Sequence, residues 1–238
     1  MKRLVLGPGG SMVYALSGFL MSSNLSDLEE ISASSAGALA AAAYLIGLDT
    51  DTILRIDIAG LTKPSIRNLL KTGGLVSTQK IRDHLLEHST ETFEELFRRT
   101  NVTLHIAVTS VAKGTVVYLS KDTAPEMRVA DAVAASIAIP FLFEPHLGFL
   151  DGSMTEELPI GPFVGRDYVA VRVPVDIPKT VEGPMGVVHS IVNMIYRLRA
   201  RHEGPTVDIP PLANILNFKL SQDDKIRLML SGCCKALQ

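Results

Sequence analysis

Residues 33–37 read Ala33-Ser34-Ser35-Ala36-Gly37, the most informative short segment of the chain. It follows a stretch at 28–32 that passes from apolar to small residues, and it precedes an alanine-rich run at 38–43 that predicts a helix. A serine with small residues two positions away on each side, between a strand and a helix, is typical of a nucleophile elbow, the sharp turn that lifts a hydroxyl above the edge of an α/β sheet. The alternative is a plain helix start at which the serines act as caps.

Two serines compete for the role of nucleophile. Ser34 has Ser32 and Ala36 as its flanking residues, whereas Ser35 has Gly37 on the helix side, where a helix must approach the sheet most closely. We therefore expect Ser35 to be the nucleophile, with Ala33 and Gly37 completing the elbow. The helix that follows would place free N–H groups and its positive end beside the hydroxyl.

The first residues of the chain predict a strand followed by a glycine-rich loop, Gly7-Pro8-Gly9-Gly10-Ser11. Glycines in such a loop let several backbone N–H groups converge on one point, which suits a phosphate or an oxyanion. The spacing excludes the G-x-G-x-x-G pattern of dinucleotide-binding folds, because position 12 is a methionine. A plain turn is the alternative.

An acidic residue with catalytic potential lies in the segment Phe149-Leu150-Asp151-Gly152-Ser153. Asp151 ends a short apolar strand, which is the usual place for a catalytic group in an α/β sheet. An Asp-Gly pair also forms tight turns, and that interpretation stays open from this segment alone.

Taken together, the glycine-rich loop, the serine elbow and the Asp-Gly pair resemble the patatin-like phospholipase family. The likeness extends over about residues 3–175, with a family-like end at 215–233. Further segments that look like family segments, in family order, are 92–97, 104–109, 131–141 and 151–160.

The chain departs from the family pattern near the proposed chemistry. Pro8 replaces the first glycine of the family's triplet, and its missing N–H can cost about 3 to 4 kcal/mol of transition-state stabilisation if it leaves an oxyanion hole one donor short. The other departures are Met12 for a usual Lys or Arg, Val13 and Ala33 for glycines, and Ser153 and Glu157 after the aspartate. Low turnover is therefore an alternative to full activity.

The resemblance implies a three-layer α/β/α fold with a central, mostly parallel sheet and a lipid acyl hydrolase that needs no metal or organic cofactor. Ser35 would attack the ester carbonyl, and Asp151 would accept its proton and pass it to the leaving alcohol. The oxyanion would be held by the N–H groups of Gly9, Gly10 and Ser11, helped by Ala36. The substrate would be a phospholipid or another acyl-ester lipid. The alternative is a patatin fold of low activity that binds lipid or a partner.

Composition agrees with a compact enzyme. A chain of 238 residues with 47% hydrophobic content predicts one domain over 1–238. The net charge of -2 argues against a nucleic-acid partner. The two cysteines, Cys233 and Cys234, are adjacent and close no useful disulfide loop, so we expect a cytoplasmic protein, with contact at the periphery of membranes.

Alternating patterns predict the secondary structure. Strands are expected near 3–7, 28–33, 102–109, 115–119, 148–151, 167–173 and 214–218. Helices are expected near 12–22, 35–46, 50–59, 78–89, 92–99, 127–136, 185–202 and 222–236, with loops at 177–184 and 204–211.

Two further patterns have ordinary explanations. His84-Leu85-Leu86-Glu87-His88 matches the H-x-x-E-H zinc pattern, but its charged neighbours favour a solvated helix and no bound metal. Arg197, Arg199 and Arg201 with His202 would complement the end of a helix dipole, the alternative being contact with anionic lipid headgroups.

Overall fold

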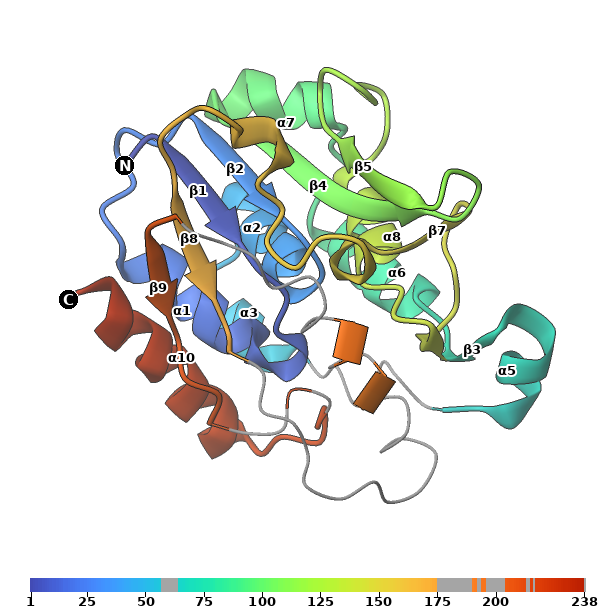
Figure 1. The fold of residues 1–238 in the computed structure, drawn as a ribbon. Helices are drawn as coiled ribbons and strands as arrows, with labels where there is room; N and C mark the ends of the chain where they lie inside the picture. The colour runs from blue at the N-terminus through green and yellow to red at the C-terminus, as the bar shows by residue number, and fades with distance from the viewer. Residues whose placement is uncertain are drawn as a thin grey trace.

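The computed structural model describes residues 1–56, 64–174, 190–191, 194–195, 204–212, 215 and 217–237. The main sheet has the order β5-β4-β2-β1-β8-β9, and β7 also pairs with β4 (Figure 1). Its strands are β1 (Arg3–Leu6), β2 (Glu30–Ala33), β4 (Thr103–Ser110), β5 (Thr115–Leu119), β7 (Phe149–Asp151), β8 (Val169–Arg172) and β9 (Thr206–Asp208). A separate two-stranded sheet consists of β3 (Gly74–Val76) and β6 (Phe141–Phe143).

Most pairs in the main sheet are parallel, and only β5 and β7 run antiparallel to β4. The helices are α1 (Val13–Ser22), α2 (Ala36–Ile46), α3 (Thr50–Arg55), α5 (Ile66–Thr72), α6 (Gln79–His88), α7 (Phe93–Thr100), α8 (Val129–Ser136) and α10 (Gln222–Ala236), with 3-10 turns η1 (Gly10–Met12), η2 (Gly152–Met154) and η3 (Gly161–Phe163). A mostly parallel sheet between covering layers confirms the predicted α/β/α fold.

Helix α2 packs against the sheet because its side chains are small. Its alanines 38, 40, 41 and 42 are fully buried. At Gly37 the helix comes so close to β1 that a Cβ atom would lie 2.6 Å from the carbonyl oxygens of both Leu6 and Gly7. The sequence predicted this close approach through the glycine at position 37. The opposite face of the sheet is covered by the segment around η3, where Phe163 and Leu158 pack on Val5 and Ala170.

Most expected elements are present. The bounds expected for β5 and α10 are those observed, and the other matched elements differ by a few residues at their ends. The expectation of a loop over 204–211 was wrong, because β9 pairs in parallel with β8 there. This strand is only three residues long, and Pro205 and Pro210, which suggested a loop, flank it.

A strand was also expected over 214–218, but residues 215, 217 and 218 are not in a strand. Instead the Phe218 ring packs edge-to-face on Phe143, with ring centroids 6.0 Å apart. The end of the helix expected at 50–59 and nearly all of the helix expected at 185–202, with its cationic residues, lie outside the described residues, as does the loop at 177–184. The sequence did not predict α5, β3 or β6.

His84 and His88 lie together on α6, with ring centroids 5.2 Å apart, and His84 pairs with Glu87. Within the described ranges, no group of three or more His, Cys, Asp or Glu side chains clusters as a metal site would require.

The part of the chain that the structure describes holds no helix with the length and apolarity to cross a bilayer.

Candidate active site

Ser35 occupies the turn between β2 and α2 in a strained backbone conformation. Its φ of 54° and ψ of -125° are unusual for a residue with a side chain, and such a conformation costs on the order of 1 to 3 kcal/mol. It is held in place by α8, because the Ser35 N–H donates to Ser136 Oγ at 2.9 Å and Ser136 Oγ donates to the carbonyl of Ala107 at 2.8 Å. Ser136 thus ties the elbow to β4.

Ser34 has a different environment. It is completely buried, and its Oγ has no hydrogen-bond partner among the residues that the structure describes. Its carbonyl accepts the N–H groups of Gly37 and Ala38, which begins the helix. The backbone conformation of an elbow therefore occurs at Ser35 and not at Ser34, which favours the choice of nucleophile made from the sequence.

The register of the sheet explains why Asp151 comes close to Ser35. Strand β2 pairs with β4 up to Ala33 opposite Ile106, and then turns away into the elbow. Strand β5 occupies the other edge of β4, so β7 pairs with the edge that β2 has just left, with Asp151 opposite Val108. The serine and the carboxylate thus both lie at the point where one strand replaces the other.

Asp151 is held rigidly and is 0% exposed. Its Oδ1 accepts two hydrogen bonds from Ser153, one from the N–H at 2.9 Å and one from Oγ at 2.5 Å. Its own N–H donates to the carbonyl of Ala138 at 3.0 Å, and its carbonyl accepts from Thr109 Oγ1 at 2.8 Å. Only Oδ2 lacks a well-formed hydrogen bond to any described residue.

Burial raises the pKa of Asp151 to about 6, although hydrogen bonding by Ser153 and by the Ser35 hydroxyl lowers it in part. The Ser35 side chain is therefore close enough to stabilise the carboxylate, even though Oδ2 has no well-formed bond. Loose contacts between nucleophile and base are usual in sites without substrate. A carboxylate with a pKa near 6 is mostly ionised at neutral pH and is a better base than an ordinary aspartate.

The glycine-rich loop leads into η1 beside the start of α2. Ser11, which the sequence predicted to be an oxyanion donor, directs its N–H to the carbonyl of Ile215 at 2.7 Å. Gly10 has a φ of 54°, and a side chain there would collide with the same carbonyl. The N–H groups of Gly9, Gly10 and Ala36 donate to no backbone carbonyl of a described residue. Three of the four predicted donors thus have no backbone acceptor among the described residues, whereas the Ser11 N–H is engaged by Ile215.

A narrow apolar pocket of about 30 Å³ lies beside Ser35. It has room for only a few atoms, such as those that begin an acyl chain. Its lining comes from the glycine loop, α2, α6, β6 and the segment after Ile215, namely Gly10, Ser35, Ala36, Leu39, Ile81, Ile137, Ile139, Phe143 and Phe218.

Sequence reasoning did not identify Ser136, Ile215 or Phe218 as part of this site. Ser136 had one usable signal, since it is the hydroxyl that ends a helix made mostly of alanine and valine. Ile215 acts through a backbone carbonyl, and residue type carries no information about such a contact. Ser153 appeared only as a departure from a family pattern, yet it binds the proposed base directly.

Comparison with known proteins gives a consistent result. The family model described as patatin-like phospholipase matches residues 4–164, which is more than half of the chain. No curated protein sequence matches. Among solved structures, VipD from Legionella pneumophila is similar with a TM-score of 0.63 and 15% identity, over 100% of this chain and 66% of that one.

Two structures of the type III effector ExoU are also similar. One has a TM-score of 0.56 and 17% identity, over 98% of this chain and 52% of that one. The other, in complex with SpcU from the type III secretion system of Pseudomonas aeruginosa, has a TM-score of 0.52 and 18% identity, over 99% and 50%. The chain therefore spans half to two thirds of the length of these proteins, and at such identities the likeness shows a shared fold.

Proposed function

Because the chain belongs to the patatin-like phospholipase family, we propose that it hydrolyses the carboxylic ester bond of a phospholipid or another acyl-ester lipid with a Ser35–Asp151 dyad. The observation that carries the proposal is the sheet register, which brings a serine in an elbow and a buried carboxylate to the same point of β4. The pKa of about 6 for Asp151 suits a general base at neutral pH.

The reaction would proceed in two steps. Asp151 takes the proton of Ser35 Oγ as that oxygen attacks the ester carbonyl, and the oxyanion is held by the N–H groups of Gly9, Gly10 and Ala36. When the tetrahedral species collapses, Asp151 gives the proton to the departing alcohol and an acyl-serine remains. Water, deprotonated by Asp151, then attacks the acyl-serine, and the proton returns to Ser35 as the fatty acid leaves.

A second function has support of its own. Pro8 lacks an N–H, and Ser11 donates to Ile215, so the loop offers fewer oxyanion donors than its length would allow. Met12, which replaces the family's basic residue, is fully buried in the core and brings no charge to the loop. These features favour the alternative of a patatin fold that binds lipid or a protein partner and turns over slowly.

We further propose that the protein works in a reducing compartment such as the cytoplasm, in contact with the surface of a membrane. Cys233 and Cys234 are both free thiols, and Cys234 is exposed. Exposed thiols are kept reduced in such a compartment.

Labelling with a fluorophosphonate probe, followed by peptide mapping, tests the assignment. The probe should modify wild-type protein and Ser34→Ala, and it should fail to modify Ser35→Ala. A folded wild-type chain that takes no label would favour the binding function. Labelling that is lost in Ser34→Ala alone would show that the nucleophile was chosen wrongly.

A further inference from the structure

Helix α5 projects from the body of the protein (Figure 1), and none of its residues is buried. Ile66 is 73% exposed and Leu70 is 84% exposed. Residues four apart lie on the same face of a helix, so these two side chains form one apolar stripe. A single exposed apolar residue is ordinary, but an apolar stripe on a projecting helix is typical of a contact surface.

The neighbouring strand extends this apolar surface. Gly74, two residues after the end of α5, pairs with Phe141 of β6. Phe141 is 57% exposed and has a φ of 67°, an unfavourable conformation for an aromatic residue. Three large apolar side chains, from α5 and the strand paired next to it, are therefore exposed at this end of the molecule.

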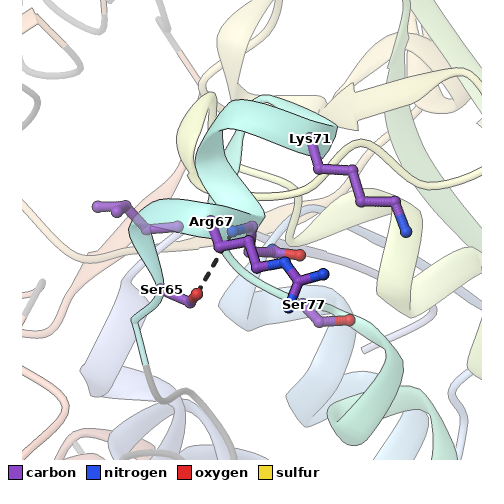
Figure 2. Close-up of a pocket in the computed structure, with 6 residues that line it drawn as sticks. Ser65, Arg67, Lys71 and Ser77 are labelled. Atoms are coloured by element: carbon purple, nitrogen blue, oxygen red, sulfur yellow. Dashed lines mark hydrogen bonds between the residues drawn. The ribbon is translucent and has the colours of Figure 1, made fainter.

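A basic pocket lies against the same helix. It encloses about 370 Å³ and is lined by Ser65, Arg67, Asn68, Lys71, Leu75 and Ser77. Figure 2 shows the side chains of Arg67 and Lys71 extending from α5 over this pocket. They are four residues apart and hence on one face, next to the apolar stripe.

Among the described residues, no carboxylate forms an ion pair with the basic side chains of this pocket, Arg67 and Lys71. The segment 64–78 contains no aspartate or glutamate. Among the described residues, one carboxylate is bonded to the pocket lining. It belongs to Glu144, which accepts a hydrogen bond from Ser77 Oγ.

We propose that α5 and Phe141 dock the protein on a bilayer that contains anionic phospholipids. Ile66, Leu70 and Phe141 enter the boundary between headgroups and acyl chains, while Arg67 and Lys71 bind headgroup phosphates above it. The choice of a lipid surface over a protein partner rests on the proposed lipid hydrolysis and on the pairing of apolar and basic faces on one short helix.

The position of this surface fits the active site. Strand β6 begins with Phe141 at the surface and ends with Phe143, which lines the narrow pocket beside Ser35. Docking through α5 would therefore place the bilayer about the length of strand β6 away from the narrow pocket beside Ser35. A lipid would then have only a short distance to travel to reach Ser35.

Vesicle sedimentation tests the proposal. Binding is measured in the Ser35→Ala background, so that lipid is not consumed, with phosphatidylcholine vesicles that contain or lack phosphatidylserine. Each basic residue near an anionic surface contributes about fivefold to binding, so Arg67→Gln with Lys71→Gln should weaken binding to the phosphatidylserine vesicles about thirtyfold. Ile66→Ser with Leu70→Ser should weaken binding to both kinds of vesicle at least about tenfold.

Matched controls come from exposed residues elsewhere on the molecule. Val164→Ser removes an apolar side chain that is 75% exposed, and Lys113→Gln removes an exposed charge, and both should bind as the parent does. Circular dichroism and thermal unfolding check that every variant is folded. If the folded α5 variants bind vesicles like the controls, the proposed membrane-docking surface is wrong. The exposed face of α5 would then be assigned to a protein partner.

The two proposals can fail separately. A wild-type chain that binds vesicles through α5 but hydrolyses no lipid would contradict the proposed activity and support the docking surface. A chain that hydrolyses vesicle lipid equally well with and without the α5 substitutions would contradict the docking surface and support the activity.

Discussion

The backbone N–H of Ser11 donates to the carbonyl of Ile215 at 2.7 Å, so a residue near the end of the chain binds the loop near its beginning. Ile215 is itself buried, and Phe218, three residues later, lines the pocket beside Ser35. The availability of one predicted oxyanion donor therefore depends on how firmly this distant segment is packed.

We expect Ile215→Ala to raise kcat on a soluble short-chain ester, because a smaller side chain holds the carbonyl less firmly and releases Ser11. The gain from one recovered oxyanion donor has a ceiling of about a thousandfold. Loss of a buried isoleucine should lower the free energy of unfolding by about 2 kcal/mol or more. Steady-state kinetics with urea unfolding measures both quantities, and Leu212→Ala, at an exposed position, is the control. A lower kcat in a folded variant would show that the contact supports the active geometry.

Ser35→Ala and Asp151→Asn should each reduce ester hydrolysis by at least about a thousandfold, since removal of one member of a catalytic pair disables the whole unit. Ser34→Ala is the matched control and should retain activity. Comparable turnover in a folded Ser35→Ala protein would rule out the dyad.

The activity should depend on the ionisation of Asp151. Because burial raises its pKa to about 6, kcat/KM should rise with pH and level off above neutrality. Ser153→Ala removes a hydrogen bond that lowers this pKa, so the rise should move to higher pH. A pH profile of each protein on one ester gives the comparison, and an unchanged midpoint in Ser153→Ala would mean that the hydroxyl does not tune the base.

Stability should also depend on the ionisation of Asp151. It should fall as the pH rises, whereas activity should increase. The folded pKa of about 6 exceeds the ordinary value of 3.8, so the folded chain binds the proton more tightly than the unfolded chain does. The free energy of unfolding should therefore fall by about 2 kcal/mol as the pH rises from about 4 to 7. Asp151→Asn cannot titrate and should lack this loss. Urea unfolding of both proteins across that range shows it, and parallel pH profiles would contradict it.

Pro8→Gly restores a backbone N–H in the glycine-rich loop, so it should raise kcat with little change in KM. The added freedom of the unfolded chain should cost about 0.4 to 1 kcal/mol of stability. Kinetics on one phospholipid and one soluble ester provide the measurement. An unchanged or lower kcat in the folded variant would mean that the loop with proline already fits its role, and the low-activity alternative would lose its main support.

The sequence predicted those parts of the molecule that depend on local pattern. Small residues around Ser35 predicted the elbow, and Gly37 indeed lies where the helix touches β1. The short elements α5, β3, β6 and β9 were missed because three to seven residues are too few to establish a period, and no motif stands beside them as the Asp-Gly pair stands beside the equally short β7. Contacts between distant segments, such as Ser11 with Ile215 and Ser35 with Ser136, depend on the assembled fold and leave little trace in residue type.

The succession of β2 and β7 along one edge of β4 has a consequence for biosynthesis. The proposed nucleophile, Ser35, is translated more than a hundred residues before the strand at 149–151 that carries its proposed base. Since chains begin to fold from their N-terminal end during synthesis, β1, β2 and β4 can pair while that edge is still vacant. A ribosome-bound or truncated chain that ends before β7 carries Ser35 without Asp151, so the proposed ester hydrolysis requires that the chain has folded past β7.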